Sequence, residues 1–148
     1  MILPNEMIGI DTNILAYARI SDSPWHDAAK TFLQGLSHDV DVVISELVLL
    51  EFYLLLRNDK ILSPPLSPDE AVRECQHFRA HPRWQLIDSA DVMSDVWPIA
   101  ASIGFPRRRI VDVRLAKTLQ AAGVTAFATA NVKDFNGLGF QKVWNPLD

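Results

Sequence analysis

The sequence has 148 residues, of which 49% are hydrophobic and 22% charged, and its formal net charge at pH 7 is −4. This length and apolar content suit one compact domain with a sizeable core, so we expect a single domain over residues 1–148. The single cysteine, Cys75, excludes an internal disulfide and a cysteine-rich zinc site. The negative charge argues against a protein that wraps nucleic acid over a broad basic surface.

The sequence contains neither a recognisable signal peptide nor a membrane span. Its beginning lacks the basic start and long apolar core of a signal peptide. The longest apolar stretch, Leu47 to Leu56, is interrupted by Glu51 and is too short to cross a bilayer. We therefore expect a soluble cytoplasmic protein without membrane attachment.

Short apolar runs alternate with helical patterns along the chain, which is the order of a parallel α/β sheet. No glycine-rich phosphate loop is present, so dinucleotide-binding and P-loop folds are poorly supported. Strands are predicted at residues 7–10, 41–44, 84–87, 124–128 and 142–144. Helices are predicted at residues 14–19, 25–35, 45–58, 67–80, 89–103 and 112–122.

Two helix signals are specific enough to fix local structure. Ser67-Pro68-Asp69-Glu70 combines a capping serine, a first-turn proline and a glutamate three residues after the cap, which predicts a helix start. Pro98 should kink the helix predicted around it or begin a separate segment. The histidine pair His77 and His81, at i and i+4, lacks a nearby glutamate motif and is interpreted as a solvated helix end.

Asp11 directly follows the first predicted strand. In an open α/β sheet the carboxyl ends of the strands face the functional crevice, so Asp11 is a candidate metal ligand. Thr12 or Asn13 would cap the next helix, and the exposed amides of that turn would orient the carboxylate. The alternative is that Asp11 only ends a strand and caps a helix.

Glu51 lies within an apolar helical stretch that should be buried on more than one side, by the sheet and by a second subunit. An ionised carboxylate there is costly unless it is paired or bound to a cation. We favour a cation ligand over the alternative, a salt bridge with Arg57 or Lys60.

Two further candidates lie later in the chain. Asp112 opens a predicted helix, and its side chain should lean towards the interior side of the first turn. Asn131 and Asp134 follow the strand predicted at residues 124–128. Each of these groups could instead serve only as a helix cap.

In a parallel sheet, strand ends and the helices that follow them can converge. Asp11 and Asn131 lie at the ends of predicted strands, and Glu51 and Asp112 lie on the helices that follow. Hard oxygen ligands without thiolate or imidazole suit Mg²⁺ or Mn²⁺, which bridge to phosphate oxygens. Phosphodiester hydrolysis is the chemistry that this combination favours.

The motifs D-T-N-I-L, S-E-L-V-L-L-E-F-Y, D-V-R-L-A and T-A-N-V-K-D-F occur in this order. Together they resemble the PIN-domain ribonucleases, in particular the VapC-type toxins of toxin–antitoxin pairs, over essentially the whole chain. The resemblance implies a three-layer α/β/α sandwich with a central parallel sheet and an acidic Mg²⁺ pocket. It also implies a homodimer and inhibition by a co-encoded antitoxin whose C-terminal part covers the pocket.

Residue by residue, Asp11, Glu51 and Asp112 match the first three acids of that family. Thr12 and Asn13 match the polar positions that accompany them. The fourth family position is often an aspartate, and this chain has Asn131 there, with Asp134 three residues later. This departure leaves open whether one or two metal ions bind and whether Asp134 takes over as a ligand.

The function implied is a metal-dependent endoribonuclease, in which the cation activates a water and neutralises charge at the phosphorane-like transition state. The only dense basic run, Arg107, Arg108 and Arg109, lies just before Asp112 and would line the pocket rim and contact the RNA backbone. An ordinary solvated loop is the alternative for these arginines.

Two rival functions belong to other classes. A haloacid-dehalogenase-like phosphatase also begins with an aspartate after its first strand, but it needs a second acid at the position of Asn13, so it is disfavoured. A non-catalytic PIN-fold module that binds RNA or protein is opposed by the three intact acids and kept open by Asn131.

Overall fold

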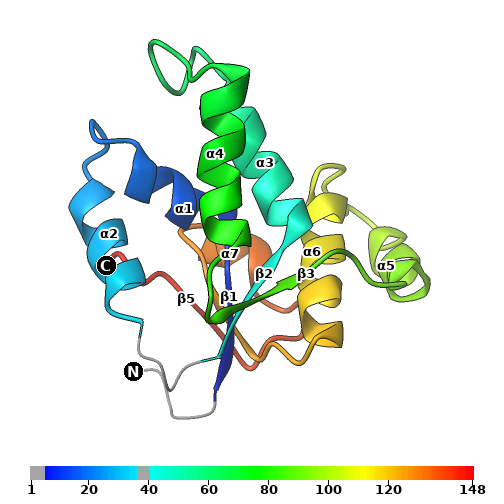
Figure 1. Ribbon diagram of the computed structural model, residues 1–148. Helices are drawn as coiled ribbons and strands as arrows, with labels where there is room; N and C mark the ends of the chain where they lie inside the picture. The colour runs from blue at the N-terminus through cyan, green and yellow to red at the C-terminus, as the bar shows by residue number, and fades with distance from the viewer. Residues whose placement is uncertain (1–5, 37–40) are drawn as a thin grey trace.

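The computed structural model of the chain describes residues 6–36 and 41–148 (Figure 1). Over these residues it contains one five-stranded sheet with the order β3-β2-β1-β4-β5, and each pair of neighbours is parallel. The strands are β1 Met7–Ile10, β2 Asp41–Ser45, β3 Trp84–Ile87, β4 Ala126–Ala128 and β5 Lys142–Trp144.

The predicted strands are all present, and the last but one is shorter than expected. The strand β4 begins at Ala126 because the Val124 N–H donates to the Leu119 carbonyl, at the end of the preceding helix. The chain builds β2 and β3 on one side of β1 and then β4 and β5 on the other. The strand order therefore reverses at the junction of β1 and β4, which is the place where open α/β sheets bind ligands.

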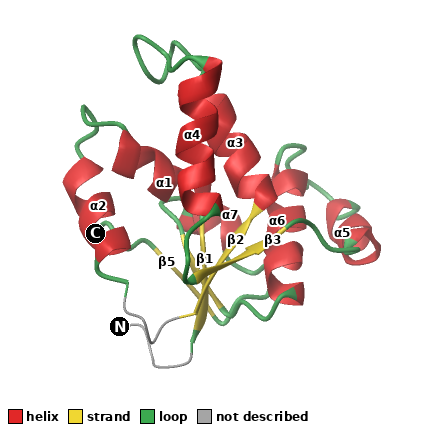
Figure 2. Cartoon of the chain, in the orientation of Figure 1, coloured by secondary structure: helices red, strands yellow, loops and turns green. Residues whose placement is uncertain are grey.

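Helices cover the sheet on both sides, so the fold is a three-layer α/β/α sandwich. In Figure 2, α1 and α2 lie on one side of the strands and α5 and α6 on the other, while α3 and α4 lie side by side. The helices are α1 Thr12–Arg19, α2 His26–Gln34, α3 Glu46–Leu56, α4 Pro68–Arg79, α5 Met93–Ala100, α6 Arg109–Ala121 and α7 Val132–Phe135.

Two helix predictions are wrong in detail. The helix predicted at residues 89–103 is confined to Met93–Ala100, and Pro98 lies inside it without beginning a separate segment, since a proline removes only its own N–H from the hydrogen bonds of a helix. The helix α6 begins at Arg109 and not at Asp112, because the Arg109 N–H already donates to the Pro106 carbonyl in the preceding turn. Asp112 consequently lies inside the first turn.

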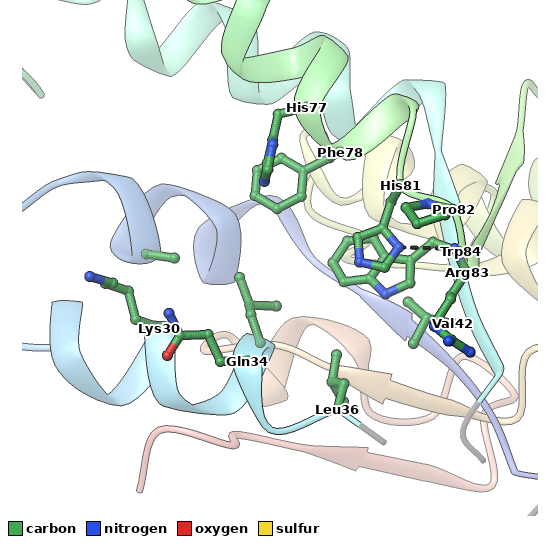
Figure 3. A pocket seen from close by; sticks show the side chains of 12 residues that line it. Lys30, Gln34, Leu36, Val42, His77, Phe78, His81, Pro82, Arg83 and Trp84 are labelled. Carbon is green, nitrogen blue, oxygen red and sulfur yellow. Dashed lines mark hydrogen bonds between the residues drawn. The ribbon is translucent and has the colours of Figure 1, made fainter. Parts of the chain in front are cut away.

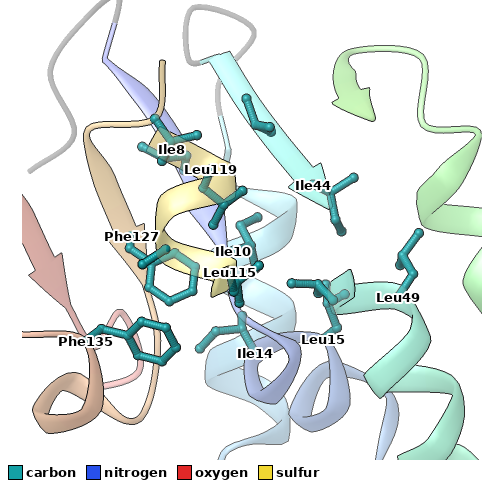
Figure 4. Packing of buried hydrophobic residues seen from close by; sticks show 14 of the residues in the cluster. Ile8, Ile10, Ile14, Leu15, Ile44, Leu49, Leu115, Leu119, Phe127 and Phe135 are labelled. Atoms are coloured by element: carbon teal, nitrogen blue, oxygen red, sulfur yellow. The ribbon is translucent and has the colours of Figure 1, made fainter. Parts of the chain in front are cut away.

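The core is a single apolar cluster between the sheet and the helices (Figure 4). Ile8, Ile10 and Phe127 are buried at the centre of the sheet, against Leu119 of α6. A Cβ atom at Gly9 would lie 3.1 Å from Leu119 Cδ1 and 3.2 Å from Phe127 Cδ1, so the close contact between β1 and its neighbours depends on this glycine. This packing fixes the end of β1, where Asp11 follows.

Among the described residues, none of the helices combines the length and the apolar character that a bilayer-spanning segment requires.

Candidate active site

Among the described residues, Asp11 is a buried acid whose carboxylate accepts three hydrogen bonds from neighbouring groups. Its carboxylate accepts hydrogen bonds from the Thr12 N–H at 2.8 Å, the Thr129 hydroxyl at 2.7 Å and the Asn13 side-chain amide at 3.2 Å. Its own N–H donates to the Ala128 carbonyl at 2.9 Å, and only 6% of the residue is exposed. Asp11 itself is the N-cap of α1, so the prediction that Thr12 or Asn13 caps this helix is wrong.

Thr12 connects Asp11 to Glu51. The Thr12 hydroxyl is buried and donates towards Glu51 Oε2, at 3.1 Å, and the Val48 carbonyl oxygen, at 3.2 Å. Two side chains of adjacent helices, α1 and α3, are thereby held at one end of the sheet. The Arg57 guanidinium donates to the Tyr53 hydroxyl at 2.8 Å, which gives it a partner other than Glu51.

Glu51 is exposed, contrary to the burial expected from its apolar surroundings in the sequence. The helix α3 buries Val48 and Phe52 against the core, whereas Leu50 is 65% and Leu54 is 59% exposed. The apolar residues on the outer side of this helix therefore do not bury Glu51 within one chain. Its proximity to Thr12, and not burial, links it to Asp11.

Asp11 and Asp112 both have strongly raised pKa values. The pKa of Asp11 is raised from 3.8 to about 6, mainly by burial and in smaller part by the charges of Glu51 and Asp112, while hydrogen bonds from Thr129 and Thr12 oppose the rise. Burial also raises the pKa of Asp112 to about 6, followed by the charges of Asp134 and Glu51, while Arg109 opposes the rise. These carboxylates thus repel one another across a shared space.

That space is a pocket of about 170 Å³. Its polar lining consists of Asp11, Thr12, Asn13, Glu51, Asp112 and Asn131, with Leu55 and Phe135 as its apolar lining. The structure therefore brings together the three predicted acids and three of the predicted polar residues. Asp134 is not among the lining residues, although its charge acts on Asp112.

Thr129 is a site residue that the sequence analysis did not single out. It is fully buried, donates to Asp11 and accepts hydrogen bonds from the Asn131 N–H at 2.9 Å and the Asn13 amide at 3.4 Å. The side-chain amide oxygen of Asn13, Oδ1, accepts from the Ala130 N–H at 3.1 Å. The available signal was its place directly after β4, which matches the place of Asp11 directly after β1.

The donor set suits a hard, hydrated cation. The pocket offers carboxylate, hydroxyl and amide oxygens, and no lysine or arginine lines it. Within the described ranges 6–36 and 41–148, no group of three or more His, Cys, Asp or Glu side chains has the arrangement of a preformed metal site. Mg²⁺ keeps several water ligands in most proteins. Some of the acids can therefore bind the ion through a water molecule, and the pocket does not need every carboxylate in direct contact with it.

The three arginines of the basic run are placed differently from one another. Arg107 and Arg108 are exposed in the turn before α6. Arg109 is half-buried, and its guanidinium donates to the carbonyl oxygens of Asp134 at 3.3 Å and Asn136 at 3.1 Å. No member of the run lines the acidic pocket.

A larger pocket of about 490 Å³ lies between α2 and α4, near the start of β3 (Figure 3). Lys30, Arg83 and two histidines line it, and no acid does. The histidine pair differs from the predicted solvated helix end, because His81 is half-buried and stacks on Trp84 with ring centroids 4.4 Å apart, while His77 is exposed. Without carboxylates this pocket does not suit a Mg²⁺ ion.

An apolar groove of about 450 Å³ adjoins the acids on the side of α3, α5 and α6. Glu51 and Asp112 belong to its lining as well as to that of the acidic pocket. Its other lining residues, which define the apolar groove, are Leu47, Leu50, Leu54, Met93, Ile110, Val111, Arg114 and Leu115.

Comparison with known proteins agrees with this architecture. The family model of the PIN domain matches residues 8–140. Ribonuclease VapC24 of Mycobacterium tuberculosis is 48% identical over 141 residues, which cover 95% of this chain and 97% of that protein. The chain therefore belongs to the PIN-domain family, in the group of the VapC-type proteins.

Solved structures show the same fold at lower identity. The crystal structure of Mycobacterium tuberculosis VapC20, described as a sarcin-ricin loop cleaving toxin, has a TM-score of 0.67 at 19% identity and covers 90% of this chain and 95% of its own. The structure of VapBC2 from Rickettsia felis, bound to a DNA fragment from its promoter, has a TM-score of 0.59 at 20% identity. It covers 94% of this chain and 98% of its own.

Proposed function

We propose that this chain is a Mg²⁺-dependent endoribonuclease that hydrolyses RNA phosphodiester bonds, acting in the cytoplasm as the toxin of a toxin–antitoxin pair. The observation that carries the proposal is the pocket in which Asp11, Glu51 and Asp112 repel one another, with the pKa values of Asp11 and Asp112 raised to about 6. Such repulsion is relieved by a bound cation. The ribonuclease name of the relative at 48% identity supports the reaction.

Asp11, Glu51 and Asp112 would hold Mg²⁺, directly or through water, with the Asn131 amide oxygen as a further ligand. When bound, the ion lowers the pKa of a water molecule and neutralises charge on the phosphate. Thr129 and the Thr12 N–H fix the orientation of Asp11 through their hydrogen bonds. Glu51 is exposed at the pocket, so its carboxylate can accept a proton from the attacking water.

Asn131 and Asp134 have different roles in this proposal. Asn131 lines the pocket as a neutral ligand, which lowers the negative charge relative to family members with aspartate there. Asp134 lies outside the lining and acts on Asp112 through its charge. A single ion is therefore our proposal for the metal content.

Arg107 and Arg108, which are exposed before α6, are proposed to contact the RNA backbone. This role is electrostatic, so the contribution of these arginines to RNA binding should weaken as salt concentration rises.

The proposed partners are a second copy of the chain and an antitoxin. Leu50, Leu54 and Val111 are 65%, 59% and 61% exposed around the apolar groove, which is the kind of surface that a homodimer buries. Residues 1–148 act as a single domain in this assembly. The similarity to the fold of VapBC2, a two-component assembly, supports an antitoxin partner.

The experiment that tests the function is mapping of new RNA 5′ ends in bacterial cells after brief induction of the wild-type chain. The matched control is Asp11→Asn, expressed at the same soluble level, because it removes one carboxylate charge from the pocket. Discrete new ends only with the wild type are expected. Equal cleavage by the variant would overturn the metal-dependent mechanism.

A binding module that keeps the PIN fold is the second candidate, and Asn131 in place of the usual fourth acid is the observation that favours it. In that case neither protein would produce new RNA ends, while both would bind RNA or a partner protein with equal affinity. The same expression experiment therefore separates the two candidates.

A further inference from the structure

We infer that Arg109 is a positioning residue of the acidic pocket: it fixes α7 against α6, and with it Asn131 against Asp112. The inference rests on the proposed metal-dependent function and refines one part of it. It divides the basic run into two exposed arginines that remain available to RNA and one that belongs to the architecture of the site.

Arg109 bridges two helices through backbone atoms. It is the first residue of α6, and its Nε and Nη2 atoms donate to the carbonyl oxygens of Asp134 and Asn136, at 3.3 and 3.1 Å. These carbonyls lie at the C-terminal end of α7, where a helix has no internal donors for them. A guanidinium at this place both satisfies the carbonyls and interacts favourably with the end of the helix.

The short helix α7 needs such a contact because it has only four residues and cannot be stable alone. Phe135 anchors its inner side, with 2% of the residue exposed and its ring centroid 4.6 Å from that of Phe127. Arg109 holds its C-terminal end. The helix α7 is therefore held at its start by the bond of the Asn131 N–H to Thr129, on its inner side by Phe135 and at its C-terminal end by Arg109.

The residues that depend on this arrangement are those of the pocket. Asp112 follows Arg109 by three residues in the first turn of α6, and Asn131 lines the same pocket from the start of α7. Loss of Arg109 would change the placement of the proposed ligands Asp112 and Asn131 relative to each other.

The same geometry limits the part that Arg109 can take in RNA recognition. Arginine binds phosphate most strongly through two parallel N–H groups on one edge of its guanidinium. In Arg109 the edge formed by Nε and Nη2 is occupied by the two carbonyls, so a phosphate could bind only through the Nη1–Nη2 edge. Arg107 and Arg108 are exposed, so the structure leaves them for the phosphate contacts.

The test compares Arg109→Gln with Arg107→Gln and Arg108→Gln, each of which removes one positive charge from the same run. The first measurement is Mn²⁺ binding to the protein without RNA, followed by the electron paramagnetic resonance signal of the free ion. The second is RNA cleavage over a range of salt concentrations. Arg109→Gln should weaken Mn²⁺ binding roughly tenfold, as expected for loss of a residue that orients metal ligands, and lower kcat with KM unchanged.

The two matched variants should behave in the opposite way. Arg107→Gln and Arg108→Gln should bind Mn²⁺ as the wild type does, raise KM, and reduce the slope of log affinity against log salt by about 0.7 each for single-stranded RNA. The inference is overturned if Arg109→Gln shows this second pattern with unchanged Mn²⁺ binding.

Arg109→Lys separates geometry from charge and protects the test against misfolding of the glutamine variant. Lysine keeps the charge but cannot span two carbonyls with a rigid fork, so weakened Mn²⁺ binding should persist. Full recovery with lysine would overturn the bridging role. If Asp11→Asn also leaves Mn²⁺ binding unchanged, the proposed metal site itself is wrong. If Asp11→Asn weakens Mn²⁺ binding but Arg109→Gln leaves it unchanged, only the role inferred for Arg109 is wrong.

Discussion

Asp11 has hydrogen-bond donors on both carboxylate oxygens, and yet burial keeps its pKa near 6. A carboxyl group whose pKa is raised by folding binds protons more tightly in the folded state than in the unfolded one. The resulting destabilisation is complete above about pH 6 and disappears as the pH falls below the ordinary value of 3.8. The free protein therefore carries an energetic cost at neutral pH that a cation would remove.

We therefore expect the stability of metal-free Asp11→Asn, relative to the wild type, to rise between pH 5 and pH 7.5 by roughly 1 kcal/mol, because the cost of ionising Asp11, roughly 3 kcal/mol when complete, falls on the wild type alone. The asparagine also loses hydrogen bonds, since its amide nitrogen faces donors that the carboxylate accepted, but this loss does not depend on pH. At pH 5 the cost of ionisation is smaller, because the folded wild type is then largely protonated at Asp11. Urea unfolding at the two pH values measures this, with the exposed Asp59→Asn as the control. A stability difference between variant and wild type that is the same at both pH values would contradict the burial argument.

At the same scale, the sequence identified the acids but not all the reasons for them. Asp11, Glu51 and Asp112 do line one pocket, whereas the argument from burial applies to Asp11 and Asp112 and is wrong for Glu51. Thr129 escaped notice because a threonine after a strand is common. Only the register that pairs Ile10 with Ala128 places its hydroxyl beside Asp11.

At the scale of elements, local signals in the sequence were most reliable where the residues concerned lie close together in the chain. Ser67 and Glu70 form the predicted capping box at the start of α4, with the Ser67 hydroxyl accepting from the Glu70 N–H at 3.2 Å and the Glu70 carboxylate accepting from the Ser67 N–H at 3.1 Å. The start of α6 was misplaced by three residues because no capping side chain marks it.

Ser67→Ala should lower the free energy of unfolding by roughly 1 kcal/mol, since it removes the acceptor for one helix N–H. For a chain of this length the corresponding fall in Tm is about 3 °C. RNA cleavage should be unchanged, because none of the residues of this cap lines the acidic pocket. Thermal unfolding followed by circular dichroism measures the effect, and Ser67→Asp, which keeps an acceptor, should retain most of the stability. Equal losses in both variants would argue against the cap as the cause.

At the scale of the whole molecule, the apolar character of α3 predicted an additional burial surface. In the structure, Leu50 and Leu54 of this helix line the apolar groove and remain more than half exposed, so we propose this groove as that surface. The sequence could not specify which side of the helix would be open, because apolar residues occur on almost every side of it. This side emerges only when the sheet, α1 and α4 occupy the others.

The double variant Leu50→Asp, Leu54→Asp should convert the proposed dimer to single chains of 16.6 kDa, because each new carboxylate would lose its hydration in the interface. Light scattering coupled to size-exclusion chromatography measures the mass. Val72→Asp is the matched control, since Val72 is 45% exposed on α4 and lies outside the apolar groove. A wild-type mass of one chain at micromolar concentration would refute the proposed dimer.

The hydrogen bonds of Asp11 also bear on the synthesis of the protein. Its N–H is bonded to Ala128 and its carboxylate to Thr129, more than a hundred residues later in the chain. While the protein is being translated, Asp11 leaves the ribosome long before either partner has been made. The pocket is therefore incomplete until the strand β4 has been released and paired with β1. A nascent chain therefore lacks its assembled pocket for nearly the whole of translation. The complete pocket forms only when synthesis of the chain is ending.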